Sequence, residues 1–145
     1  MSQLNVFTAD ASRGRVDGST TGTGVYLYEL EPGEASCPYH YEFQEEWLLV
    51  VDGTVSVRTP DGERTFERGE LVCFPAGPAG AHKIMNRGET AARTLLWSHR
   101  GSIEVSVYPD SDKIGVFPGG DDDGFYRRGD AVEWAYGEEN LGRVD

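Results

Sequence analysis

Apolar and polar residues alternate along much of the chain in short runs separated by turn-forming residues. Val25–Leu30 is the clearest run, rich in β-branched and aromatic residues. Turn signals that contain Gly, Pro or Asp recur at intervals of roughly 8–12 residues, and no window has a convincing helical period. The pattern predicts an all-β sandwich or barrel, with further strands expected before and after residue 53 and at 64–66, 71–74, 81–86 and 92–98.

The segment 33–53 carries the most concentrated candidate chemistry. His40, Glu42 and Glu46 occupy even positions. In a regular extended strand, side chains alternate between faces, so these three would point the same way. Imidazole and carboxylate groups that converge on one face can bind a divalent metal ion.

The Asp-Gly pair at 52–53 lies between two apolar runs and predicts a two-residue hairpin turn. Such a hairpin would pair Val50 with Val55 and Leu48 with Val57. The even positions of the first strand would then have apolar partners, as an interior face should. The even face is therefore predicted to point inward.

The opposite, odd face of the same strand carries an apolar stripe of Trp47, Leu49 and Val51. On a strongly charged protein, an apolar stripe of this kind is expected to be buried by other residues. If the monomer does not supply them, a partner subunit must, so we expect a homodimer.

Charge and composition narrow the classes of partner. The net charge is −12 and the pI is about 4.6, which argue against nucleic acid and against an anionic membrane surface. The N-terminal stretch has no apolar signal core, and no run approaches a membrane span, so we expect a cytoplasmic protein. Cys37 and Cys73 have no metal-binding or disulfide spacing and are expected to be packed, although Cys37 is close enough to His40 in sequence to be a weak candidate for a site thiol.

The composition suggests three parts. Residues 1–24 are polar and rich in Gly, Ser and Thr, and are expected to form a flexible N-terminal arm. Residues 25–108 contain the predicted strands of the barrel. Residues 109–145 hold ten acidic and four basic residues, and are expected to form an acidic extension packed on the barrel or on a partner subunit.

Two spaced motifs lie on strand-like sequence about 16 residues apart. The first comprises Gly33, His40, Glu42, Glu46 and Gly53. The second comprises Gly69, Pro75, Gly77, His82 and Asn86. Together they resemble the paired motifs of the cupin superfamily. The resemblance covers roughly residues 24–100, and Val107–Val116 is also similar to small bacterial cupins named as sugar-phosphate isomerases.

The resemblance implies a double-stranded β-helix, a conical barrel of two antiparallel sheets with a metal near its wider mouth. His40, Glu46 and His82 lie at the family's metal-ligand positions, a set suited to one divalent ion of Fe, Mn, Ni or Zn. Glu42 replaces the usual second histidine. It is a candidate fourth ligand, a candidate acid/base, or the mark of a site that has lost its metal. Asn86 is expected to be a structural hydrogen-bonding residue.

These expectations favour a metal-dependent enzyme, isomerase- or epimerase-like, acting on a small polar sugar-like or oxo-acid substrate. The metal would polarise a carbonyl, and Glu42 or Glu46 would be available as catalytic groups for proton transfer. Two alternatives stay open, because the barrel hosts many chemistries. One is a non-haem Fe(II) dioxygenase, and the other is a non-catalytic cupin that binds a small molecule.

Overall fold

The computed structural model of the chain describes residues 3–11, 15–101 and 103–137. The described part is built from antiparallel strands, and its helical segments are short 3-10 turns: η1 (Pro78–Gly80), η2 (Pro109–Ser111), η3 (Gly120–Asp122) and η4 (Arg128–Asp130). None of these has the length and hydropathy needed to cross a bilayer. The all-β prediction is confirmed.

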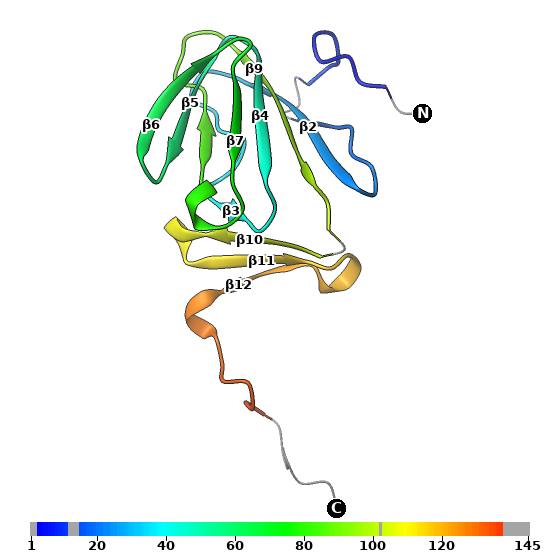
Figure 1. The fold of residues 1–145 in the computed structure, drawn as a ribbon, viewed down its shortest axis with the longest axis vertical. Helices are drawn as coiled ribbons and strands as arrows, with labels where there is room; N and C mark the ends of the chain where they lie inside the picture. Colours follow the sequence, from blue (N-terminus) through cyan, green and yellow to red (C-terminus); the bar gives the residue numbers. More distant parts are fainter. Residues whose placement is uncertain (1–2, 12–14, 102, 138–145) are drawn as a thin grey trace, which may run out of the picture.

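The strands form three sheets (Figure 1). The five-stranded sheet has the order β1 (Arg15–Asp17), β2 (Thr23–Leu30), β9 (Ala92–His99), β4 (Glu46–Asp52) and β7 (Leu71–Phe74). The three-stranded sheet has the order β6 (Gly62–Glu67), β5 (Thr54–Thr59) and β8 (Lys83–Met85). The four-stranded sheet has the order β12 (Gly124–Arg127), β11 (Lys113–Phe117), β10 (Glu104–Tyr108) and β3 (Tyr41–Glu42).

The two smaller sheets continue into each other. An isolated antiparallel bridge joins His40, just before β3, to His82, just before β8. This composite sheet faces the five-stranded sheet across the core, which gives the double-stranded β-helix that the resemblance implied. Beyond the bridge, β10, β11 and β12 run across the lower end of the barrel strands and extend past them (Figure 1).

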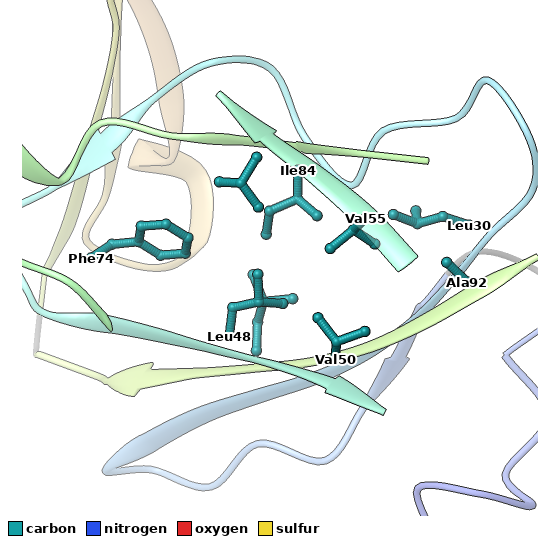
Figure 2. Close-up of a cluster of buried hydrophobic side chains, with 9 residues drawn as sticks. Leu30, Leu48, Val50, Val55, Phe74, Ile84 and Ala92 are labelled. Carbon is teal, nitrogen blue, oxygen red and sulfur yellow. The ribbon is translucent and has the colours of Figure 1, made fainter. Parts of the chain in front are cut away.

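The barrel core is filled mainly by aliphatic side chains from both facing sheets, together with the ring of Phe74 (Figure 2). Leu48 and Val50 come from β4, and Val55 and Val57 come from β5, each at most 1% exposed. Burial of one such side chain stabilises the fold by about 1.5–3 kcal/mol. The even face of β4 therefore points inward, as predicted.

The predicted hairpin at 52–53 is wrong. β4 pairs with β7 and β9, whereas β5 pairs with β6 and β8, so the chain passes from one sheet to the facing sheet at Gly53. Gly53 has a φ of 73°, and a Cβ there would meet the Ala91 carbonyl oxygen at 3.0 Å. An inward apolar face looks the same in sequence whether its partner lies beside it or across the core.

Residues near the N-terminus pack against the outer face of the five-stranded sheet. Ala11 is buried in a second cluster with Leu27 and Val51, and Leu49 packs against it. The Arg93 guanidinium donates hydrogen bonds to the carbonyl oxygens of Val6 (3.2 Å) and Ala9 (2.8 Å). The monomer thus covers part of the apolar stripe itself. Trp47 lies beyond this cover and stacks on Trp97, with ring centroids 6.2 Å apart.

Candidate metal centre

The two candidate histidines are cross-strand neighbours. His40 N–H donates to the His82 carbonyl (3.0 Å), and His82 N–H donates to the His40 carbonyl (2.8 Å). Residues paired in this way project their side chains to the same face. The imidazole centroids are accordingly 4.8 Å apart.

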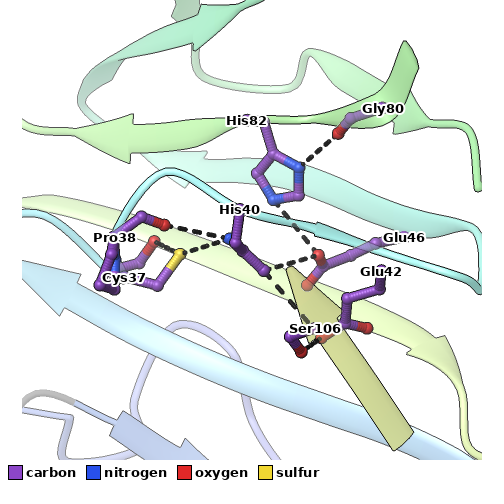
Figure 3. A network of polar contacts seen from close by, with 9 residues as sticks. Cys37, Pro38, His40, Glu42, Glu46, Gly80, His82 and Ser106 are labelled. Atoms are coloured by element: carbon purple, nitrogen blue, oxygen red, sulfur yellow. Dashed lines mark hydrogen bonds and ion pairs between the residues drawn. The ribbon is translucent and has the colours of Figure 1, made fainter. Parts of the chain in front are cut away.

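Glu46 reaches the same point from the facing sheet, where β4 begins. One ligand atom from each of His40, Glu46 and His82 lies within 4.8 Å of the others. Glu46 Oε2 is 3.2 Å from His82 Nε2 and 4.0 Å from His40 Nε2. Figure 3 shows the three groups pointing toward one another. The three side chains are well shielded, with exposures of 8%, 12% and 2%.

The other ring nitrogen of each histidine faces a backbone carbonyl. His40 Nδ1 lies 3.1 Å from the Pro38 oxygen, and His82 Nδ1 lies 2.9 Å from the Gly80 oxygen. Because a carbonyl only accepts, each Nδ1 carries the proton, and each Nε2 presents a lone pair toward Glu46. Orientation of this kind by an outer carbonyl is typical of metal-ligating histidines.

Buried polar atoms without hydrogen bonds support the same assignment. His82 Nε2 and Glu46 Oε2 are buried and have no hydrogen-bond partner, although they are only 3.2 Å apart. Two lone pairs at that separation repel unless a proton or a metal ion lies between them. The donor set, two imidazoles and one carboxylate, therefore fits a divalent transition metal.

Each histidine ring packs against an aromatic ring, and burial favours the neutral form of His40. Phe74 stacks on His82 with centroids 3.7 Å apart, and Tyr108 stacks on His40 at 5.8 Å. Burial, followed by the proximity of His82, lowers the pKa of His40. A lowered pKa favours the neutral imidazole, which is the form that binds metals.

Glu42 lies beside this cluster and is not one of its three members. Its Oε1 is 4.0 Å from His40 Nε2 and accepts a hydrogen bond of 3.1 Å from Ser106 Oγ. Burial, and then the Glu46 charge, raise the pKa of Glu42 to about 7. Its assignment as a fourth ligand stays a prediction, as does a catalytic role for either glutamate.

The predicted convergence of the even positions rested on one regular strand, and that premise is wrong. β3 ends at Glu42, the chain bends over residues 43–45, and β4 begins at Glu46 in the facing sheet. Glu42 and Glu46 approach the centre from opposite walls. The bend follows the passage between sheets, which the alternation of residues does not encode.

Sequence reasoning missed Ser106 and Tyr108 on β10, which contact Glu42 and His40. Residues 103–108 (IEVSVY) alternate apolar and polar positions, and that pattern was the available signal. Cys37 Sγ lies 3.4 Å from His40 Nδ1. Burial raises the pKa of Cys37 to about 12, so it stays a thiol at neutral pH. Asn86 is structural as expected, since its side chain donates to the Leu30 and Thr90 carbonyl oxygens.

Comparison with known proteins agrees with this geometry. Residues 26–98 match the Cupin domain family, a region that includes the whole three-residue cluster. The chain belongs to the cupin family. This cupin continues beyond the matched region with β10, β11 and β12.

Two solved structures resemble most of the chain. One, from Silicibacter pomeroyi, is described as a sugar phosphate isomerase from a cupin superfamily; it has 29% sequence identity and a TM-score of 0.72, covering 86% of this chain and 83% of that one. The other, from Acidithiobacillus ferrooxidans, is provisionally described as a sugar phosphate isomerase; it has 26% identity and a TM-score of 0.72, covering 82% of this chain and 80% of that one.

A curated relative is the tetracenomycin polyketide synthase protein TcmJ of Streptomyces glaucescens. It is 32% identical over 79 residues, which are 54% of this chain and 51% of that protein. The chain therefore matches only about half the length of this relative.

Proposed function

We propose that this cupin is a metal-dependent isomerase of small sugar-like substrates, with sugar phosphates the first class to test. The observation that carries the proposal is the orientation of both histidines. Their Nδ1 atoms face carbonyl oxygens, so two Nε2 lone pairs and Glu46 Oε2 converge with no proton donor among them. The similarity to two proteins described as sugar phosphate isomerases supports the choice of substrate class.

His40, Glu46 and His82 would hold one divalent ion of Fe, Mn, Ni or Zn. When bound, such an ion acts as a Lewis acid toward a carbonyl and its neighbouring hydroxyl. The chain's own part is to fix both imidazoles by their backbone contacts and to surround them with the Phe74 and Tyr108 rings. These rings limit the access of water, which strengthens electrostatic interactions in the site.

Glu42 is proposed as the acid/base. It lies next to the cluster, its Oε1 is oriented by Ser106 Oγ, and its side chain is 25% exposed. In an isomerisation, Glu42 takes the proton from the hydroxyl-bearing carbon beside the carbonyl and returns it to the former carbonyl carbon. The hydroxyl proton moves to the other oxygen, so no external oxidant or reductant is needed.

The test is proton exchange in heavy water. Metal-loaded protein is incubated in D₂O with aldose and ketose phosphates, and NMR follows product formation and carbon-bound deuterium. We expect Glu42→Gln to lose most of the exchange while retaining the metal. Glu45→Gln is the matched control, because Glu45 is exposed and bonds Trp47 Nε1 instead (2.7 Å). Loss of metal from Glu42→Gln would instead make Glu42 a ligand.

Two outcomes favour the other readings of the same centre. Oxygen consumption by the Fe(II)-loaded protein would identify a dioxygenase. Ligand binding with neither exchange nor oxygen uptake would identify a non-catalytic binding cupin.

We also infer that the protein is a cytoplasmic homodimer. Two parts of its surface support self-association. One is the face of the five-stranded sheet that carries the stacked Trp47–Trp97 pair and Leu71, which is 54% exposed, and the other is Trp134, which is 86% exposed. Light scattering at tens of micromolar should give twice the 15.9 kDa chain mass. A monomer at that concentration would refute the dimer. If the protein is a dimer, Trp47→Glu shows which of the two surfaces forms the interface. The substitution disrupts the dimer only if the outer face of the five-stranded sheet is buried in it.

A further inference from the structure

The inner face of the composite sheet continues past the metal cluster onto the C-terminal strands. Ser106 pairs with Gly115 across β10 and β11, and Tyr108 pairs with Lys113. Directly paired residues project to the same face, so Lys113 shares the face from which Ser106 reaches Glu42. Gly115 in turn pairs with Phe125 on β12, which places that ring on this face too.

Two aromatic rings hold the Lys113 ammonium. Its Nζ lies 4.8 Å from the centroid of Tyr108 and 5.2 Å from that of Phe125. Such cation–π contacts orient the charge without neutralising it. Gly115 leaves room for the Phe125 ring and its neighbour Phe117, because a Cβ there would lie 2.7 Å from Phe117 Cζ and 3.0 Å from Phe125 Cε1.

Lys113 differs from the paired arginines of this acidic protein. Ion pairs with carboxylates engage Arg58, Arg68, Arg87, Arg93 and Arg100. Within the described ranges, Lys113 forms no ion pair. A divalent ion at the cluster would balance the charges of Glu42 and Glu46, so Lys113 would leave a net positive charge on the wall beside the metal.

Tyr108 links this charge to the candidate centre, since its ring contacts the Lys113 ammonium on one hand and stacks on His40 on the other. The hairpin that carries both residues is fixed to the barrel at its turn. Arg58 Nη1 and Nη2 donate to the two Asp110 oxygens at 2.6 and 3.0 Å. The lysine therefore has a defined place relative to the metal ligands.

We infer that Lys113 is the anion-binding residue of this site, and that the ligand is a small sugar carrying a phosphate. Its phosphate pairs with the Lys113 ammonium, and the C–H face of the sugar lies against Phe125, which is 59% exposed. This deepens the proposed function and rests on it for the reacting end of the ligand.

The experiment is calorimetric titration of the Zn²⁺-loaded protein with glucose 6-phosphate, fructose 6-phosphate and ribose 5-phosphate, and with glucose as the neutral probe. We expect Lys113→Met to weaken the best sugar phosphate by about 10- to 100-fold, the range for a charge-assisted contact. Lys113→Arg should retain most of the affinity. Arg64→Met is the matched control, because it removes a cation lying 5.6 Å from the Phe66 ring on β6.

A second readout needs no variant. In [¹³C]lysine-labelled protein, the ring currents of Tyr108 and Phe125 should shift the Lys113 Hε signals upfield, and a bound sugar phosphate should move them again. The inference is overturned if none of the three sugar phosphates binds, or if Lys113→Met binds them like the wild type. Salicylate, an aromatic carboxylate, is titrated as an anion of a different class. Tighter binding of salicylate than of all three sugar phosphates would also overturn the inference.

The outcomes separate this inference from the proposed function. Phosphate binding that depends on Lys113 without deuterium exchange would leave the anion site standing and refute the isomerase. Deuterium exchange that persists in Lys113→Met with an unchanged KM would refute the anion site and leave the isomerase standing.

Discussion

The composite sheet has a covered half and an open half, and they differ in what they do for the site. In β5 and β8, the inward residues Val55, Val57 and Ile84 are at most 1% exposed because the five-stranded sheet faces them. In β11 and β12, which extend past the barrel strands, Phe125 on the same face is 59% exposed (Figure 1). The covered half packs the core next to the metal ligands, and the open half presents an aromatic and cationic surface beside them.

The largest effect is expected where the two halves meet. His82→Ala removes an imidazole whose Nδ1 is fixed by Gly80 and whose Nε2 faces Glu46. We expect loss of most Zn²⁺ affinity, because three protein ligands are reduced to two. In a thermal unfolding assay, Zn²⁺ should raise the melting temperature of the wild type and leave that of His82→Ala unchanged. An equal shift in both proteins would exclude His82 as a ligand.

Shortening an isoleucine should lower the free energy of unfolding more in the covered half of the composite sheet than in the open half. Ile84→Ala deletes a fully buried side chain between the facing sheets, at an expected cost of about 2–5 kcal/mol in the free energy of unfolding. Ile114→Ala makes the same change on β11, where the side chain is half-buried on the face opposite to Lys113, and should cost about 1 kcal/mol. Urea unfolding measures both values. Equal losses would mean that β11 is covered as fully as β8, for example by a second subunit.

The smallest effect distinguishes the two faces of the open half. Phe125 and Tyr126 are adjacent on β12 and similarly exposed, at 59% and 55%, but project to opposite faces. Phe125→Leu should weaken sugar-phosphate binding by about two- to fivefold through loss of one cation–π contact. Tyr126→Leu should leave the affinity unchanged. Similar losses in both variants would show that the ligand does not use the inner face.

Much of the barrel was predictable, because side-chain alternation reports directly on which face is buried. The strand expected at Leu71–Phe74 forms over those residues, and Leu48 and Val50 point inward as predicted. The partner of β4 was not predictable from the same signal. The apolar face of β4 is buried whether the next strand lies beside it in the same sheet or across the core in the opposite sheet. The turn at 52–53 was therefore interpreted as a hairpin.

Part of the site was also predictable from the sequence, namely its three candidate ligands. His40, Glu46 and His82 were named from motif spacing, and they converge. The bend at residues 43–45 separates Glu42 from Glu46, and no local sequence pattern predicts this bend. Ser106 reaches Glu42, and Lys113 lies over the Tyr108 ring near the centre, only because β10 pairs with β3, far away in sequence. Long-range pairing of this kind lies beyond what local periodicity can predict.

The central claim is that His40, Glu46 and His82 bind one divalent metal ion, and anomalous diffraction tests it most directly. Crystals of Zn²⁺-loaded protein would be measured on both sides of the zinc absorption edge. The account predicts one strong anomalous peak per chain, at about 2.0–2.2 Å from Nε2 of each histidine and from a Glu46 oxygen. The same map shows whether Glu42 coordinates the ion. A map with no peak among these three side chains, in protein that has been offered the metal, would contradict the account.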